Sequence, residues 1–175
     1  MHEPILAAAR IAAMTSQVMA NMSAGADDGF TFNVVIKEIA MFMNRLSPSA
    51  WLRTVLWTDA ASCVAMGALL AAGADALAGP FGLPAALLRA AGIGLLPFAA
   101  LVAWIAQRGA ARAGVWLVVA ANALWVVDSV ALLAFGGFAA SALGQAFVLG
   151  QAGAVAALAI LEAQALRRRD AAAAR

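Results

Sequence analysis

Four long apolar stretches, separated by short polar breaks, constrain this chain more than any other feature of its sequence. They cover about residues 55–74, 84–106, 114–135 and 141–166. Each contains roughly 20 residues or more, which is enough for a helix to cross a hydrocarbon core of about 30 Å. Because a helix satisfies its own backbone hydrogen bonds in lipid, the pattern predicts four transmembrane helices.

The composition indicates that lipid rather than water surrounds most of the chain. Of the 175 residues, 65% are hydrophobic and only 11% are charged, and the mean hydropathy is +0.91. A soluble domain is closer to half apolar and a quarter charged. So few charges would leave the apolar surface of a soluble fold uncovered. We therefore expect an all-α membrane protein with one transmembrane bundle at residues 51–169.

The scarcity of two residue types excludes several kinds of functional site. The chain has one cysteine, Cys63, and one histidine, His2. It therefore lacks the ligands for cysteine-rich zinc, bis-histidine haem and iron–sulfur sites, so we expect neither a metal nor a cofactor. We do not expect an enzyme either, because no nucleophile has a base beside it. Nucleic-acid binding is not expected, because the arginines are dispersed over the span ends.

The arginines lie on one side of the predicted bundle. They precede the first span, separate the second from the third, and follow the fourth, as Arg45, Arg53, Arg108, Arg112, Arg167, Arg168 and Arg169. The other two loops contain no lysine or arginine. Because positive residues are retained in the cytoplasm, we predict an antiparallel bundle in a bacterial inner membrane with both termini cytoplasmic. Four tryptophans fall at the same ends, where an aromatic belt is expected: Trp51, Trp57, Trp104 and Trp116.

The residues before the bundle divide into two segments. Residues 31–46 have apolar side chains along one helical face and polar side chains along the other, which predicts an amphipathic helix. This helix lies in the cytoplasmic interface, or it packs against the bundle or a partner protein. Residues 1–30 form a helical or flexible extension without a secretory signal. Met41 and Met43 are alternative starts, because the residues after them form an ordinary entry to a first span.

Three ionisable residues within the predicted spans are candidates for a functional role: Asp59, Arg89 and Asp128. A charge at the centre of a span costs about 2.5–3.5 kcal/mol, so it usually faces the bundle interior and has a partner. Arg89 and Asp128 lie at similar depths below the outer ends of their spans, which predicts an Arg89–Asp128 pair. Such a pair either fixes the helix register or binds or gates a ligand.

Asp59 lies near the cytoplasmic end of the first span and has two interpretations. As an interfacial charge it reaches Arg53, Arg108 or water. As a proton or cation site it is similar to the membrane-embedded glutamate of small multidrug transporters, although the match is one residue. Asn122 and Gln151 are the polar residues expected to hydrogen-bond between spans.

Three phrases of the sequence indicate a resemblance that covers all four spans. They are GLPAALLRAAGIGLLP at residues 82–97, NALW at 122–125 and SALGQAFVLGQA at 141–152. From Trp51 to Gln164 the chain resembles a group of small four-helix integral membrane proteins of bacterial inner membranes that has no assigned activity. The resemblance implies the bundle and the compartment, and it transfers no functional residue.

The sequence is compatible with two functions, and in both the lipid bilayer is a partner. The first is an accessory or scaffolding subunit that acts through lateral helix contacts, with another membrane protein or within a homo-oligomer. Short loops that expose little outside the membrane favour it. The second is a small proton- or cation-coupled transporter or channel that uses Asp59 or the Arg89–Asp128 pair.

Overall fold

The computed structural model describes residues 47–175, which form four helices joined by short loops. The helices are α3 (Pro48–Phe81), α4 (Ala85–Gln107), α5 (Arg112–Phe135) and α6 (Ala142–Ala173), and this part of the chain contains no β-strand. The predicted amphipathic helix at residues 31–46 and the extension at residues 1–30 lie outside the described residues.

Each of the four helices is long and apolar enough to cross a membrane. For residues 47–175 the structure confirms the prediction of an all-helical fold with four helices long and apolar enough to span a membrane. Two of the helices are longer than the predicted spans, since α3 has 34 residues and α6 has 32. At 1.5 Å per residue they are about 50 Å long, which exceeds a hydrocarbon core of about 30 Å.

Local sequence explains where the two long helices begin and where α3 ends. The hydroxyl groups of Ser47 and Ser141 accept hydrogen bonds from the first turns of α3 and α6, so each serine caps its helix. Pro48 occupies the start of α3, where its missing N–H would have had no partner. Gly82 ends α3 with φ 64°, in the left-handed region that favours glycine.

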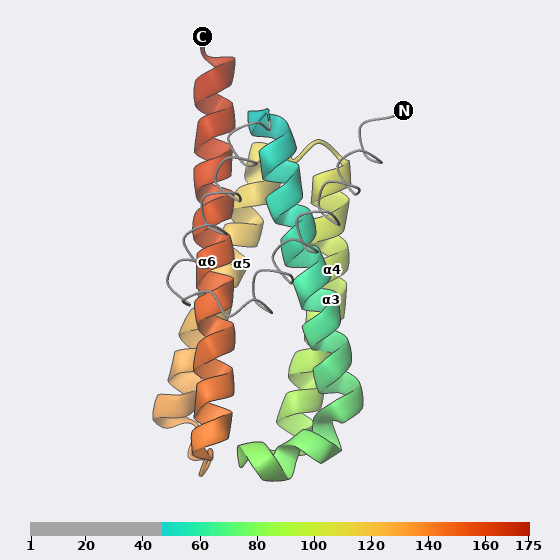
Figure 1. Ribbon diagram of the computed structural model, residues 1–175, viewed down its shortest axis with the longest axis vertical. Coiled ribbons are helices and arrows are strands. Elements are labelled where there is room, and N and C mark those ends of the chain that lie inside the picture. Colours follow the sequence, from blue (N-terminus) through green and yellow to red (C-terminus); the bar gives the residue numbers. More distant parts are fainter. Residues whose placement is uncertain (1–46) are drawn as a thin grey trace, which may run out of the picture. The chain divides into compact units, whose positions relative to one another are not determined.

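The four helices pack as two neighbouring pairs (Figure 1). α4 lies along α3, and α6 lies along α5. The close approach of α3 and α4 depends on small residues: a Cβ on Gly92 would lie 2.8 Å from the carbonyl oxygen of Gly67. α3 also packs against α6, whereas α4 and α5 have few contacts.

We call the end of the bundle where α3 and α5 begin the arginine end. It carries Arg53, Arg108, Arg112, Arg167, Arg168 and Arg169. Arg169 donates a hydrogen bond to the carbonyl oxygen of Ala110, and Arg112 lies 3.7 Å from Asp170. These contacts attach the end of α6 to the loop between α4 and α5.

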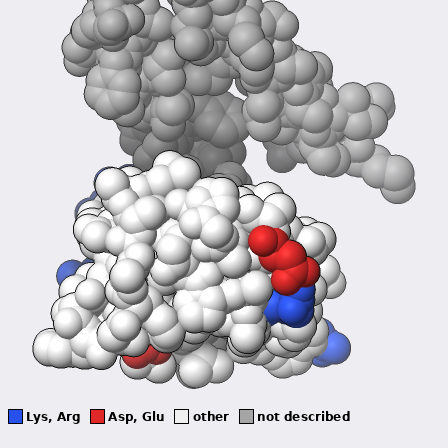
Figure 2. Space-filling model, turned by 90° about the horizontal axis from the view of Figure 1, so that it is seen from below, with Lys and Arg blue, Asp and Glu red and all other residues white. Residues whose placement is uncertain are grey.

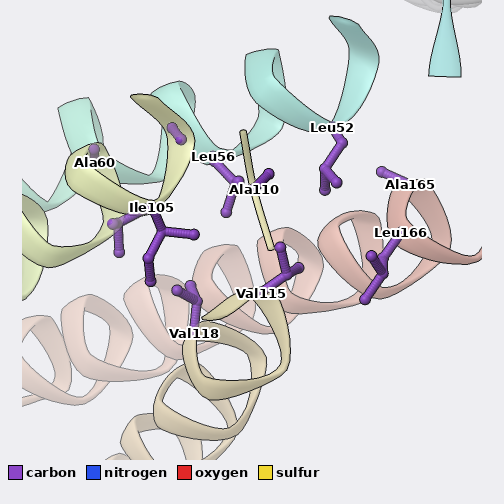
Figure 3. Close-up of a cluster of buried hydrophobic side chains, with 11 residues drawn as sticks. Leu52, Leu56, Ala60, Ile105, Ala110, Val115, Val118, Ala165 and Leu166 are labelled. Atoms are coloured by element: carbon purple, nitrogen blue, oxygen red, sulfur yellow. The ribbon is translucent and has the colours of Figure 1, made fainter. Parts of the chain in front are cut away.

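Two buried apolar clusters fill the bundle, one towards each end. The arginine-end cluster (Figure 3) consists of Leu52, Leu56, Ala60, Val102, Ile105, Ala106, Ala110, Val115, Val118, Ala165 and Leu166. The opposite-end cluster consists of Cys63, Leu70, Ala74, Phe81, Leu83, Leu88, Leu95, Ala99 and Val148. Phe81 and Phe147 stack with ring centroids 4.7 Å apart, so aromatic rings join α3 to α6 near the opposite end.

The outer surfaces of the helices are largely apolar. Leu124, Val127 and Ile160 are each more than half exposed, and the view onto the opposite end shows mostly uncharged atoms (Figure 2). Such a surface suits contact with lipid or with other membrane helices. α5 is the least covered helix, because its buried residues are limited to Val115, Val118 and Asn122.

Candidate functional site

Three buried polar side chains from three helices meet between the two apolar clusters. Asp59 on α3 and Glu162 on α6 are 0% exposed, and Asn122 on α5 is 3% exposed. Among residues 47–175 these are the buried polar or charged residues. We call the three residues the carboxylate site.

Asn122 joins the two carboxylates. Its Nδ2 donates to Oδ2 of Asp59 at 3.2 Å and to Oε2 of Glu162 at 3.3 Å. An amide nitrogen has two N–H groups, so both are used. The thiol of Cys63, one turn along α3, donates to Oδ1 of Asp59 at 3.7 Å. One amide therefore links α3, α5 and α6 through two acids.

The position of each residue along its helix explains why the three meet. Asp59 comes 11 residues after Pro48, Asn122 comes 10 after Arg112, and Glu162 comes 11 before Ala173. At the helical rise, each lies about 15–17 Å from the arginine end of its helix. These similar distances along the three helices are consistent with the contacts among the three side chains.

The carboxylates have no positive side chain against them within residues 47–175. The ion pairs in this part of the chain are Arg89–Asp75, Arg112–Asp170 and Arg169–Asp170. Oε1 of Glu162 is buried and has no hydrogen-bond partner among the described residues. A buried carboxylate without a compensating charge is strongly unfavourable. A proton or a small cation between Asp59 and Glu162 would remove that penalty.

Apolar residues surround the site along each helix. On the side of the arginine end, the nearest buried apolar residues are Leu56 on α3, Val118 on α5, and Ala165 and Leu166 on α6, and Ala60 directly follows Asp59 on α3. All of these are buried. The low dielectric of such surroundings strengthens the interaction of the two acids with each other and with any cation that binds.

The structure brings together Asp59 and Asn122, two of the residues singled out in the sequence. The interpretation of Asp59 as an interfacial charge that reaches Arg53, Arg108 or water is wrong. Its side chain is fully buried, because it continues the stripe of Leu52, Leu56 and Cys63 at helical spacing on the inner face of α3.

Arg89 pairs with Asp75 and not with Asp128. Its Nη2 lies 2.6 Å from Oδ2 of Asp75, and the two side chains are 44% and 78% exposed. Asp75 lies near the end of α3 and Arg89 near the start of α4, so the hairpin places them together. Asp128 is exposed on α5, a helix that has few contacts with α4. The predicted Arg89–Asp128 pair is therefore wrong within one chain.

Gln151 does not belong to the site. It is half-buried on α6 and lies 11 residues from Glu162, which is about 16 Å along the helix. The sequence reasoning missed Glu162, the third member of the site. A comparison of depths would have found it, because counting back from the arginines after the fourth span places Glu162 level with Asp59.

Within residues 47–175, no group of three or more His, Cys, Asp or Glu side chains is arranged to hold a metal ion. No protein-family model, curated protein or solved structure matches the chain. Its function is therefore inferred from the geometry of the site and the pattern of the sequence.

Proposed function

We propose that this protein is a small proton- or cation-coupled transporter of a bacterial inner membrane, and that Asp59 and Glu162 together hold the exchangeable ion. One observation supports this most strongly. Two fully buried carboxylates share a single amide nitrogen and have no positive side chain against them in the described residues. Ionisable groups inside spans commonly mark proton or ion pathways.

The site has the chemistry that ion exchange requires. Asn122 holds one oxygen of each acid close to the same nitrogen, so two negative charges there repel each other in apolar surroundings. One proton on either acid relieves the repulsion. When that proton leaves for water, a cation that binds the two carboxylates restores the balance of charge. Proton and cation therefore compete for one site, which is the basis of coupled exchange.

The proposal includes a topology in the membrane. We place the four helices as an antiparallel bundle with the arginine end, and therefore both termini, in the cytoplasm. The arginines at that end support this orientation, because positive residues are retained in the cytoplasm. Trp104 and Trp116 lie towards the same end and are 54% and 38% exposed, as interfacial anchors would be.

Proton release from liposomes tests the proposed exchange. The purified chain is reconstituted into liposomes with an acidic interior and an internal pH-sensitive dye, and Na⁺, K⁺ or tetraphenylphosphonium is added outside. We expect at least one of these cations to accelerate proton release. Asp59→Asn and Glu162→Gln should each lower that rate by about tenfold or more, because a single acid no longer forms the paired site.

Asp75→Asn is the matched control, because it neutralises an acid that lies on the surface at 78% exposure. This variant should keep the wild-type rate of proton release. The proposal is contradicted if none of the three cations changes the rate above that of empty liposomes. It is equally contradicted if Asp59→Asn retains full exchange in a folded protein.

A second function is favoured by a separate observation. The half of α5 from Ala123 to Phe135 contains no buried residue, and it presents the charged side chain of Asp128. Such a surface suits an accessory subunit that binds another membrane protein. Gentle detergent extraction followed by native mass measurement distinguishes the functions, since a different protein in constant stoichiometry would support the accessory function.

A further inference from the structure

The exposed face of α5 has a charge in the middle of an apolar stripe. Leu117, Leu124, Asp128 and Phe135 follow one another at spacings that place them on one side of the helix. The three apolar members are 54%, 60% and 87% exposed, and Asp128 is also exposed. No other helix among residues 47–175 covers this stripe.

Asp128 lies within the apolar length of α5 and not at its end. It is seven residues before Phe135, the last residue of α5, which corresponds to about 10 Å along the helix. A carboxylate at this depth in a span requires a partner that is positive or donates hydrogen bonds. Because its surroundings are apolar, contact with lipid alone does not stabilise the ionised carboxylate of Asp128.

Arg89 supplies the complementary group at a similar depth from the same end. It is four residues into α4, about 6 Å along the helix. Its guanidinium is 44% exposed, and only Nη2 is bound, to Asp75. A guanidinium has five N–H donors, so it can bind a second carboxylate. Ile93 and Leu96 follow on the same side of α4 and are 55% and 39% exposed.

We infer that a second copy of this chain covers the α5 stripe, with Arg89 of the partner subunit bound to Asp128. Charge complementarity, similar depth and matching apolar neighbours on α4 and α5 support this occupant. The pair does not form within one chain because α4 and α5 have few contacts. A two-fold axis repeats the same pair on the other side, so each copy provides one acid and one base.

Cysteine cross-linking in native membranes tests this dimer. Cys63→Ser provides the background, because a serine hydroxyl replaces the thiol donor to Asp59. Two copies with different tags are co-expressed, one with Leu124→Cys and the other with Ile93→Cys. We expect an oxidant to form a disulfide between the two introduced cysteines, which gives a product of twice the monomer mass that carries both tags. Leu69→Cys, at 49% exposure on α3, is the matched control for Ile93→Cys and should give no such product.

The charge on Asp128 provides a second test in the same cells. Asp128→Arg should lower the yield of cross-linked dimer about tenfold or more, because like charges then face each other, whereas Asp128→Glu should retain it. Monodisperse behaviour after detergent extraction shows whether each variant folds. Cross-linking of Leu124→Cys to a protein of different mass, or equal yields for Asp128→Arg and wild type, would overturn the inference. Neither result depends on proton exchange.

Discussion

Acidic side chains occupy two different environments in the two halves of the bundle. In the carboxylate site, Asp59 and Glu162 are fully buried and share Asn122. Towards the opposite end, Asp75 is 78% exposed and meets Arg89 at 2.6 Å. Within residues 47–175, the exposed acid is paired with an arginine, whereas the two buried acids share an amide and have no positive side chain against them. This difference shows why the buried pair is the better candidate for binding an exchangeable ion.

The two regions should also differ in their effect on stability. An exposed ion pair contributes about 0.2–1 kcal/mol, because water screens it and long side chains lose freedom. Loss of a hydrogen-bond donor to a buried charged group costs about 1.5–3 kcal/mol for each bond, because the desolvated group is left unsatisfied. Three substitutions test this contrast, in order of expected effect.

Asn122→Leu should have the largest effect. It removes the amide whose nitrogen donates to both carboxylates, so the loss of two such bonds should lower the free energy of unfolding by about 3–5 kcal/mol. Thermal unfolding of the detergent-extracted protein measures the change. Ser129→Ala is the control on the same helix, because the Ser129 hydroxyl bonds only to the Trp125 carbonyl one turn earlier. A loss below about 1 kcal/mol for Asn122→Leu, within the range of one ordinary hydrogen bond, would show that the amide does not hold the acids together.

Glu162→Gln should lower the rate of exchange without lowering stability. A glutamine amide can accept from Asn122 and donate to Asp59, and it removes the orphaned Oε1. The free energy of unfolding should therefore stay constant or rise by about 1–3 kcal/mol. The rate of proton release from liposomes should nevertheless fall by about tenfold or more. A destabilised variant with normal proton release would mean that Glu162 is a structural residue.

Asp75→Asn should have the smallest effect on stability. It breaks the exposed pair with Arg89, and the free energy of unfolding should fall by no more than about 1 kcal/mol. The same unfolding measurement applies, repeated at high salt. A loss above about 2 kcal/mol would place this pair with the buried groups and remove the contrast between the two regions.

Local composition was sufficient to predict the four helices. A run of apolar residues long enough to cross a membrane is a property of consecutive positions, and each predicted span is occupied almost entirely by one helix. The full lengths of α3 and α6 were not predicted. Helices continue past an apolar run until a capping or breaking residue ends them, as Gly82 does for α3.

The candidate site was predicted only in part. Asp59 and Asn122 stood out because they interrupt apolar spans, yet Glu162 was missed and Arg89 was assigned to the wrong acid. Similar depth limits which residues can pair, but it does not say which helices touch. The tertiary structure decides which helices touch: α4 and α5 have few contacts, whereas α3 packs against α6.

The sequence by itself determined that the chain forms apolar helices, where they lie along the chain, and that the arginines cluster at alternate helix ends. Those properties follow from side-chain hydropathy and from the fixed rise of a helix. Only the tertiary structure decided that Asp59, Asn122 and Glu162 meet, and that Arg89 turns to Asp75. Contact between distant residues depends on which helix faces pack together, and small residues such as Gly67 and Gly92 set that packing through close approach.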